Sequence, residues 1–143
     1  HAALAACYRN IGRYREAGTL YRSLLRASPK NEDFLLGLAL CLDKSGSGAT
    51  AVELLEKGAP YVGTSGPWSA LGILYARKGR VERALEAFRK AADLDPRDPK
   101  PLRNLARIYE KTGLADLAKK YKARAAAAER SSKTPESLAK PGR

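Results

Sequence analysis

The chain has 143 residues, of which 44% are hydrophobic and 29% are charged, and its formal net charge is +12. This composition is typical of a soluble domain with its own core, and it excludes a disordered chain. Two cysteines are too few for a disulfide scaffold, and the one uncharged run long enough to span a bilayer, residues 58–76, is broken by prolines and glycines.

Apolar residues recur at three- and four-residue spacing, which predicts helices joined in pairs. In chain order, the first helix of each pair is expected at about residues 1–11, 32–44, 67–78 and 99–111. The second helix of each pair is expected at about residues 14–27, 49–58, 81–93 and 115–130. The loosest connections are expected at residues 45–48 and 60–67, and the basic segment 131–143, which has no apolar period, is expected to be a disordered tail.

The pairs repeat with a period of 33 or 34 residues. A glycine falls between the two helices of every pair, at Gly12, Gly46, Gly79 and Gly113. Glycine adopts the left-handed conformation that ends many helices. A small residue falls at the same place in every second helix, at Ala17, Ala51, Ala84 and Ala118. Small side chains allow two helix axes to cross closely.

The third repeat carries the fullest pattern, with Trp68, Leu71, Gly72 and Tyr75 followed by Ala84, Phe88, Ala91 and Pro96. This order of residues resembles the tetratricopeptide repeat (TPR) family. The resemblance implies an all-α fold, a right-handed α-solenoid of about four helix-turn-helix repeats whose last helix is extended as a cap. The repeat domain would cover residues 1–130, with repeats at about residues 1–31, 32–64, 65–98 and 99–130.

The fourth repeat departs from the pattern in a way that suits a terminal repeat. Lys122 stands where an aromatic residue or leucine is usual, and we expect it to face water because terminal repeats need a polar outer face. The alanine run 125–128 is expected to lengthen the last helix by propensity rather than by packing. Cys7 and Cys41 lie one period apart, and both are expected to be small, buried core residues.

The residues needed for catalysis are missing from the sequence. The one histidine is His1, and there is no glycine-rich phosphate loop before a lysine. We therefore expect no enzyme activity, no metal and no cofactor.

By resemblance, the first helix of each repeat lines a concave groove. The residues expected in this groove are Ala6, Arg9, Leu36, Leu40, Ser69, Ile73, Arg77, Arg103, Arg107 and Lys111. Leu36, Leu40 and Ile73 are apolar, whereas the fourth repeat is basic. The expected function is that of a scaffold, adaptor or chaperone-like module, and the expected partner is a protein or peptide with an apolar segment followed by acidic residues. The alternative filler is another part of the parent chain.

Some TPR domains grip acidic chaperone tails through Lys and Asn side chains. Here Ala2, Ala6, Leu36 and Leu40 occupy the equivalent early places, so that function is not expected. An apolar groove is more similar to TPR chaperones and assembly factors of bacterial secretion and pilus systems. A soluble protein of the cytoplasm or periplasm would fit this comparison.

The positive charge is concentrated near the C-terminus. Residues 1–98 carry 15 basic and 11 acidic side chains, whereas residues 99–143 carry 12 basic and 4 acidic side chains. The alternative function is therefore binding to nucleic acid or an anionic surface through the last repeat and tail. A solubilising cap explains the same charge, and a third hypothesis is a purely structural segment of a longer TPR array.

Overall fold

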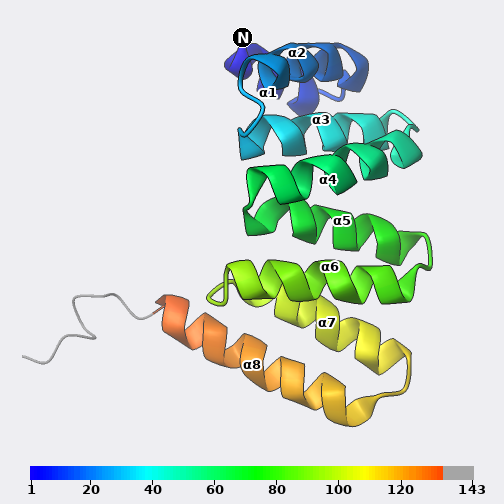
Figure 1. Cartoon of the computed structure of the whole chain (residues 1–143), viewed down its shortest axis with the longest axis vertical. Helices are drawn as coiled ribbons and strands as arrows, with labels where there is room; N and C mark the ends of the chain where they lie inside the picture. The colour runs from blue at the N-terminus through cyan, green and yellow to red at the C-terminus, as the bar shows by residue number, and fades with distance from the viewer. Residues whose placement is uncertain (134–143) are drawn as a thin grey trace, which may run out of the picture.

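The computed structural model describes residues 1–133 and consists there of eight α-helices without a strand (Figure 1). The helices are α1 (Ala2–Asn10), α2 (Tyr14–Ala27), α3 (Glu32–Lys44), α4 (Gly48–Val62), α5 (Ser65–Arg77), α6 (Val81–Leu94), α7 (Pro99–Lys111) and α8 (Ala115–Lys133). Residues 134–143, most of the expected tail, lie outside the described residues.

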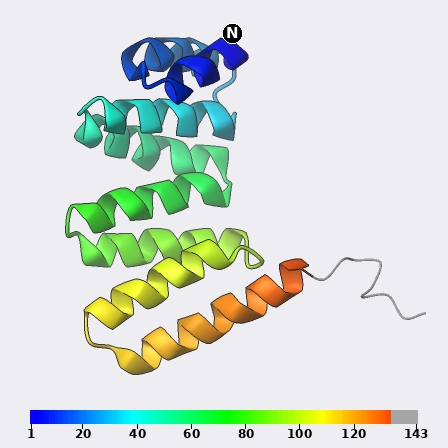
Figure 2. The same cartoon turned by 180° about the vertical axis from the view of Figure 1, so that it is seen from behind.

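Each helix packs against the helices before and after it in the chain, and α3 also packs against α5. The helical hairpins follow one another along the long axis of the molecule, from α1 and α2 at one end to α7 and α8 at the other (Figures 1 and 2). The structure confirms the expected all-α solenoid of four helical hairpins.

The turn inside every hairpin has the same geometry. Gly12, Gly46, Gly79 and Gly113 have φ between 74° and 90°, the left-handed region in which a side chain is strained. The residue after each glycine donates its N–H to a carbonyl five residues earlier, for example Arg80 N to Tyr75 O at 2.9 Å. This bond closes the first helix and turns the chain into the second.

Small residues lie where the paired helices cross. Ala5, Ala17, Ala51 and Ala84 have no exposed surface at all, and Gly72 of α5 faces the ring of Phe88 in α6. A Cβ atom on Gly72 would lie 2.7 Å from Phe88 Cε1, closer than packed carbon atoms allow. The requirement for small residues inferred from the sequence is therefore confirmed.

The second repeat differs from the sequence expectation at its end. Helix α4 continues through Pro60 to Val62 instead of ending near residue 58, and α5 begins at Ser65 rather than 67. Gly63, with φ of 80°, is the residue that ends α4. Gly58 instead allows close approach, because a Cβ there would lie 2.7 Å from Leu35 Cδ2. Pro67 is accommodated in the first turn of α5, where its missing N–H has no helical partner to lose.

The last helix also differs from expectation. Helix α8 extends to Lys133, so residues 131–133 are helical and not part of a disordered tail. Ala125 and Ala128 are 4% and 7% exposed, so the alanine run packs against the core as well as favouring the helix. Lys122 is exposed, as predicted, and it forms an ion pair with Glu110.

The two cysteines do not share an environment. Cys41 is buried, and burial raises the pKa of its thiol. Cys7 is exposed, which contradicts the sequence expectation. The reason is that Cys41 is covered by α2, whereas no described helix lies over the same face of α1.

Candidate functional site

A hollow of about 280 Å³ opens among the first helices α1, α3 and α5, and α4 contributes one residue to its floor. Its lining residues are Arg9, Leu36, Ala39, Leu40, Asp43, Leu55, Ala70, Ile73, Leu74 and Arg77. Seven of these ten side chains are aliphatic, and the three charged ones come from the last turns of α1, α3 and α5. The hollow is therefore an apolar depression with a charged side.

Two aliphatic side chains of the hollow are exposed although they are large. Leu40 of α3 is 40% exposed and Ile73 of α5 is 46% exposed. They occupy equivalent places one repeat apart, and the same place is filled by Ala6 in α1 and by Arg107 in α7. A row of equivalent positions thus follows the stack of first helices, apolar until α5 and basic at α7.

The charged side of the hollow joins two repeats. Arg77 of α5 donates to Asp43 of α3, with 2.7 Å between the Arg77 guanidinium nitrogen and Asp43 Oδ2. Arg9 of α1 lies over the Tyr21 ring, 6.0 Å from its centroid. Two arginines and one aspartate give the charged side of the hollow a net positive charge.

Five of the ten residues predicted for the groove line this hollow: Arg9, Leu36, Leu40, Ile73 and Arg77. Ala6 and Ser69 are half-buried on α1 and α5 and do not line it. Arg103, Arg107 and Lys111 are exposed on α7, beyond the hollow. The structure therefore brings together five candidates of the first three repeats and leaves the three candidates of α7 outside the hollow.

Arg103 has an intramolecular partner that the sequence did not indicate. Its guanidinium forms an ion pair with Glu129 of α8. This contact exists because α8 is longer than α7 and its last turns extend past the beginning of α7 (Figure 2). Together with the Lys122–Glu110 pair, it reduces the positive charge that this end of the solenoid presents.

Sequence reasoning missed four lining residues: Ala39, Leu55, Ala70 and Leu74. All four are small or buried residues whose positions predict core packing; Leu55 is fully buried, and Ala39 and Leu74 are 4% and 7% exposed. Asp43 also lines the hollow, and an opposite charge follows it at Arg77, 34 residues on. Such a spacing in this chain predicts contact between adjacent first helices.

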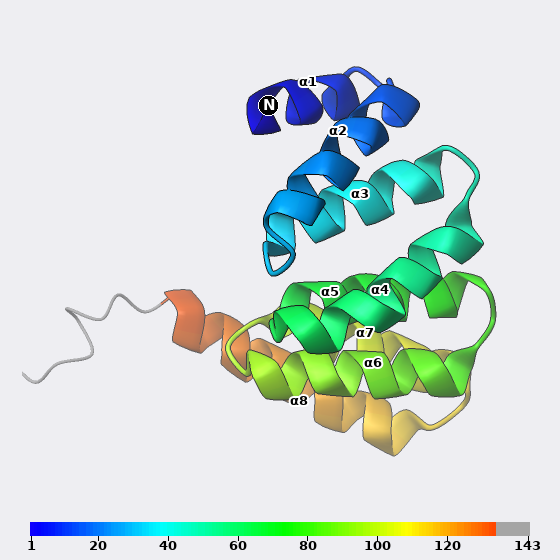
Figure 3. The ribbon, with the colours of Figure 1, turned by 45° about the horizontal axis from the view of Figure 1, so that its top comes forward.

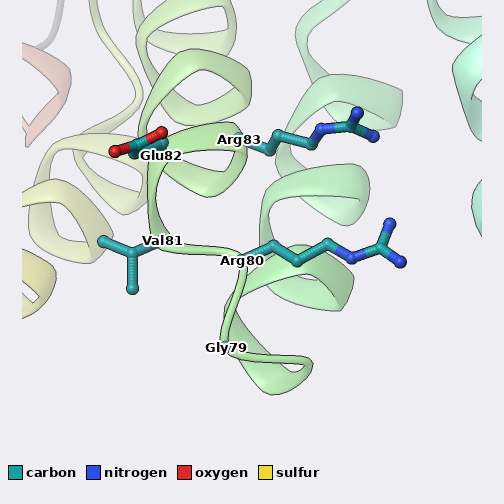
Figure 4. A pocket seen from close by; sticks show the side chains of 5 residues that line it. All are labelled: Gly79, Arg80, Val81, Glu82 and Arg83. Carbon is teal, nitrogen blue, oxygen red and sulfur yellow. The ribbon is translucent and has the colours of Figure 1, made fainter.

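A second hollow, of about 370 Å³, lies at the turn between α5 and α6 (Figure 4). All five residues that line it belong to the single stretch 79–83. Arg80 and Arg83 extend to one side of the turn, and Val81 and Glu82 point to the other. These side chains do not converge on a common point, so this hollow is a feature of the turn rather than a binding site.

Between residues 1 and 133, no helix is long and apolar enough to cross a lipid bilayer. The same part of the chain contains no group of three or more His, Cys, Asp or Glu side chains that could hold a metal ion.

Relatives of known sequence cover parts of the chain. The human protein O-mannosyl-transferase TMTC1 is 30% identical over 103 residues, which are 71% of this chain and 12% of that protein. The photosystem I assembly protein Ycf3 of Synechococcus sp. (strain CC9311) is 46% identical over 43 residues, 30% of this chain and 25% of that protein. The chain thus spans at most a quarter of the length of these two relatives.

Solved structures with the same fold cover nearly the whole chain. MamA from Desulfovibrio magneticus RS-1 superposes with a TM-score of 0.76 at 22% identity, over 93% of this chain and 76% of that one. At that identity the likeness shows the fold alone. Two sequence profiles described as tetratricopeptide repeat match residues 2–71 and 66–98. With the glycine turns and small crossing residues of all four hairpins, these matches show that the chain belongs to the tetratricopeptide repeat family.

Proposed function

We propose that this chain is a non-catalytic protein-interaction module that holds an apolar segment of a partner protein in the hollow between α1, α3 and α5. TPR repeats generally mediate protein–protein interaction. The observation that carries the proposal is the exposure of Leu40 and Ile73, two aliphatic side chains side by side in a concave surface. Burying each of them would contribute roughly 0.7–1.5 kcal/mol, since both are already half covered.

The row of equivalent positions gives the partner segment a direction. Arg107 is the next position of this row after Ile73, on the first helix of the following hairpin. A partner whose apolar side chains fill the hollow would therefore place the next residues beside Arg107 and Lys111. Carboxylates suit these positions because they form charge-assisted hydrogen bonds with arginine. The proposed partner segment is apolar, then acidic.

The alternative, attachment to nucleic acid or an anionic surface through the basic end, has less support. Two of the basic side chains at that end, Arg103 and Lys122, are engaged by Glu129 and Glu110. Tyr109 is 3% exposed and stacks on Tyr121 with ring centroids 5.5 Å apart, so neither ring is presented for stacking with a base.

Binding of two fluorescent peptide libraries tests the proposal. In both, two apolar positions drawn from Leu, Ile and Phe are followed by two fixed residues, glutamates in one library and lysines in the other. We expect the acidic library to bind more tightly, by fluorescence anisotropy, and to keep most of its affinity as salt is raised. Affinity that rests on charge alone falls steeply with salt.

Matched variants locate the binding surface. Leu40→Asp is expected to abolish binding at every salt concentration, whereas Leu94→Asp, at a residue that is 48% exposed and outside the hollow, should change nothing. Arg107→Glu should weaken the acidic library most at low salt. A folded Leu40→Asp protein that binds with unchanged affinity would disprove the proposal.

A further inference from the structure

The outer face of α1 carries apolar residues that no described helix covers. Leu4 is 45% exposed, Cys7 is exposed, and Ala3 beside them is exposed as well. These residues lie at three- and four-residue spacing and share one side of the helix. Figure 3 shows α1 at the outer end of the stack, with α2 on its inner side.

The equivalent residues of the later repeats are buried or partly buried. The position of Leu4 is filled by Leu38, Leu71 and Leu105, which are 3%, 2% and 0% exposed. The position of Cys7 is filled by Cys41 and Leu74, at 1% and 7%, and by Ile108, which is partly buried. In each case the covering helix is the second helix of the preceding hairpin: α2 packs on α3, α4 on α5, and α6 on α7.

The contact between α2 and α3 shows what covers such a face. A Cβ atom on Gly18 would lie 3.6 Å from Cys41 Cβ and 3.9 Å from Leu38 Cδ1, so α2 approaches α3 over these two side chains. Three residues further on, the Tyr21 ring packs directly over Gly37, the equivalent of Ala3. A covering helix therefore needs a small or aliphatic residue followed three residues later by a bulky apolar one.

Helices α4 and α6 carry the same pair, as Val52 with Leu55 and Leu85 with Phe88. Helix α8 does not, because Lys119 and Lys122 occupy the two positions and both are exposed. A second copy of the chain stacking its α8 on α1 would bury both lysines against Leu4 and Cys7, at a high desolvation cost. The C-terminal end is therefore closed to stacking, and the N-terminal end is open.

We propose that the outer face of α1 is a stacking surface for one more helical hairpin of this repeat, whose second helix carries the apolar pair of α2, α4 and α6. The proposal continues an interface that occurs three times in the structure. In all three, the covering helix directly precedes the covered one in the chain, joined by two to four residues. We therefore place the additional hairpin immediately before α1 in the same polypeptide.

A chimera tests the stacking surface. Residues 65–101, which contain α5 and α6, are copied directly before His1, so that His1 takes the place of Leu102 and the copied α6 meets α1 as it meets α7. The copied segment contains no cysteine, so Cys7 and Cys41 remain the two thiols. We expect the rate at which Cys7 reacts with a maleimide to fall by about tenfold or more, toward the rate of Cys41. Labelling of Cys7 would then require local opening of the copied hairpin from α1.

Two controls make the result decisive. In the chimera, Leu85→Lys in the copied helix imitates Lys119 of α8 and should restore the original labelling rate of Cys7. Far-ultraviolet circular dichroism reports whether the copied hairpin is helical. A chimera whose Cys7 reacts as fast as in the original chain overturns the proposal, whether the copied hairpin has folded or not, because a hairpin needs a neighbour to bury its apolar face.

The original chain supplies the last check. Sedimentation should show a monomer with fast Cys7 labelling at all concentrations. Association that protects Cys7 would identify a second copy as the occupant and would overturn the proposal. The peptide-binding test of the hollow is independent of both results, because Leu40 and Ile73 lie on other helices.

Discussion

Gly72 is the residue at which the fold tolerates least change. Its Cα faces the Phe88 ring so closely that even one added carbon would collide. We expect Gly72→Leu to lower the free energy of unfolding by about 3 kcal/mol or more, the upper range for overpacking. Urea unfolding followed by far-ultraviolet circular dichroism measures this change.

Ser69→Leu is the matched control for Gly72→Leu. Ser69 lies three residues earlier in α5 and is half-buried. Because part of the Ser69 side chain is exposed, a longer side chain can extend toward solvent, and we expect a cost below about 1 kcal/mol. Equal costs for the two substitutions would show that the assignment of crossing and groove positions is wrong.

The two cysteines should react at different rates in the native protein. Burial covers Cys41 and raises the pKa of its thiol, which lowers the fraction of reactive thiolate at neutral pH. We expect a thiol reagent to modify Cys7 quickly and Cys41 only after unfolding, with both reacting fast in urea. Mass spectrometry of the modified peptides distinguishes the sites, and fast native labelling of Cys41 would contradict the structure.

At the scale of the helix, α8 shows where packing adds to propensity. Ala125 is buried and Ala127, two residues further, is exposed. We expect Ala125→Lys to destabilise the protein by about 1–3 kcal/mol, because a lysine would enter the apolar contact with α7. Ala127→Lys should stay within about 0.5 kcal/mol. If both are neutral, α8 is held by helix propensity alone.

The number and order of the helices were predictable, because each hairpin repeats one pattern of apolar residues, crossing alanine and turn glycine. Helix ends were less predictable where one residue type serves two purposes. Gly58 and Gly63 both lie near the end of α4, yet only Gly63 has positive φ, while Gly58 admits the Leu35 side chain. Nothing local in the sequence distinguishes a glycine that ends a helix from one that allows close approach.

At the scale of the whole molecule, protection against amide hydrogen exchange should follow the stack. Helix α1 buries only Ala5, whereas α5 and α6 each bury five residues and have neighbours on both sides. We expect α1 to exchange fastest and α5 and α6 slowest, because a solenoid opens from its ends. Slower exchange in α1 than in α5 would mean that the outer face of α1 is already covered in solution.

The site was less predictable than the fold. Equivalent positions in the repeats indicated which side chains face the groove, and Leu36, Leu40 and Ile73 do line one hollow. The charge that the basic end presents could not be predicted from the repeat pattern, because the Arg103–Glu129 ion pair depends on the extra length of α8. Contacts between non-equivalent positions of different repeats need the superhelical geometry, which the repeat pattern does not specify.

The hollow is shared by successive hairpins, since its lining comes from α1, from α3 and α4, and from α5. No single repeat contains the site, although every repeat contains the pattern of apolar residues, crossing alanine and turn glycine that forms its hairpin. Exchanging the order of two hairpins would therefore leave a well-packed solenoid that has lost the hollow. During evolution, duplication or loss of a repeat in this region would change what the protein binds long before it changed whether the protein folds.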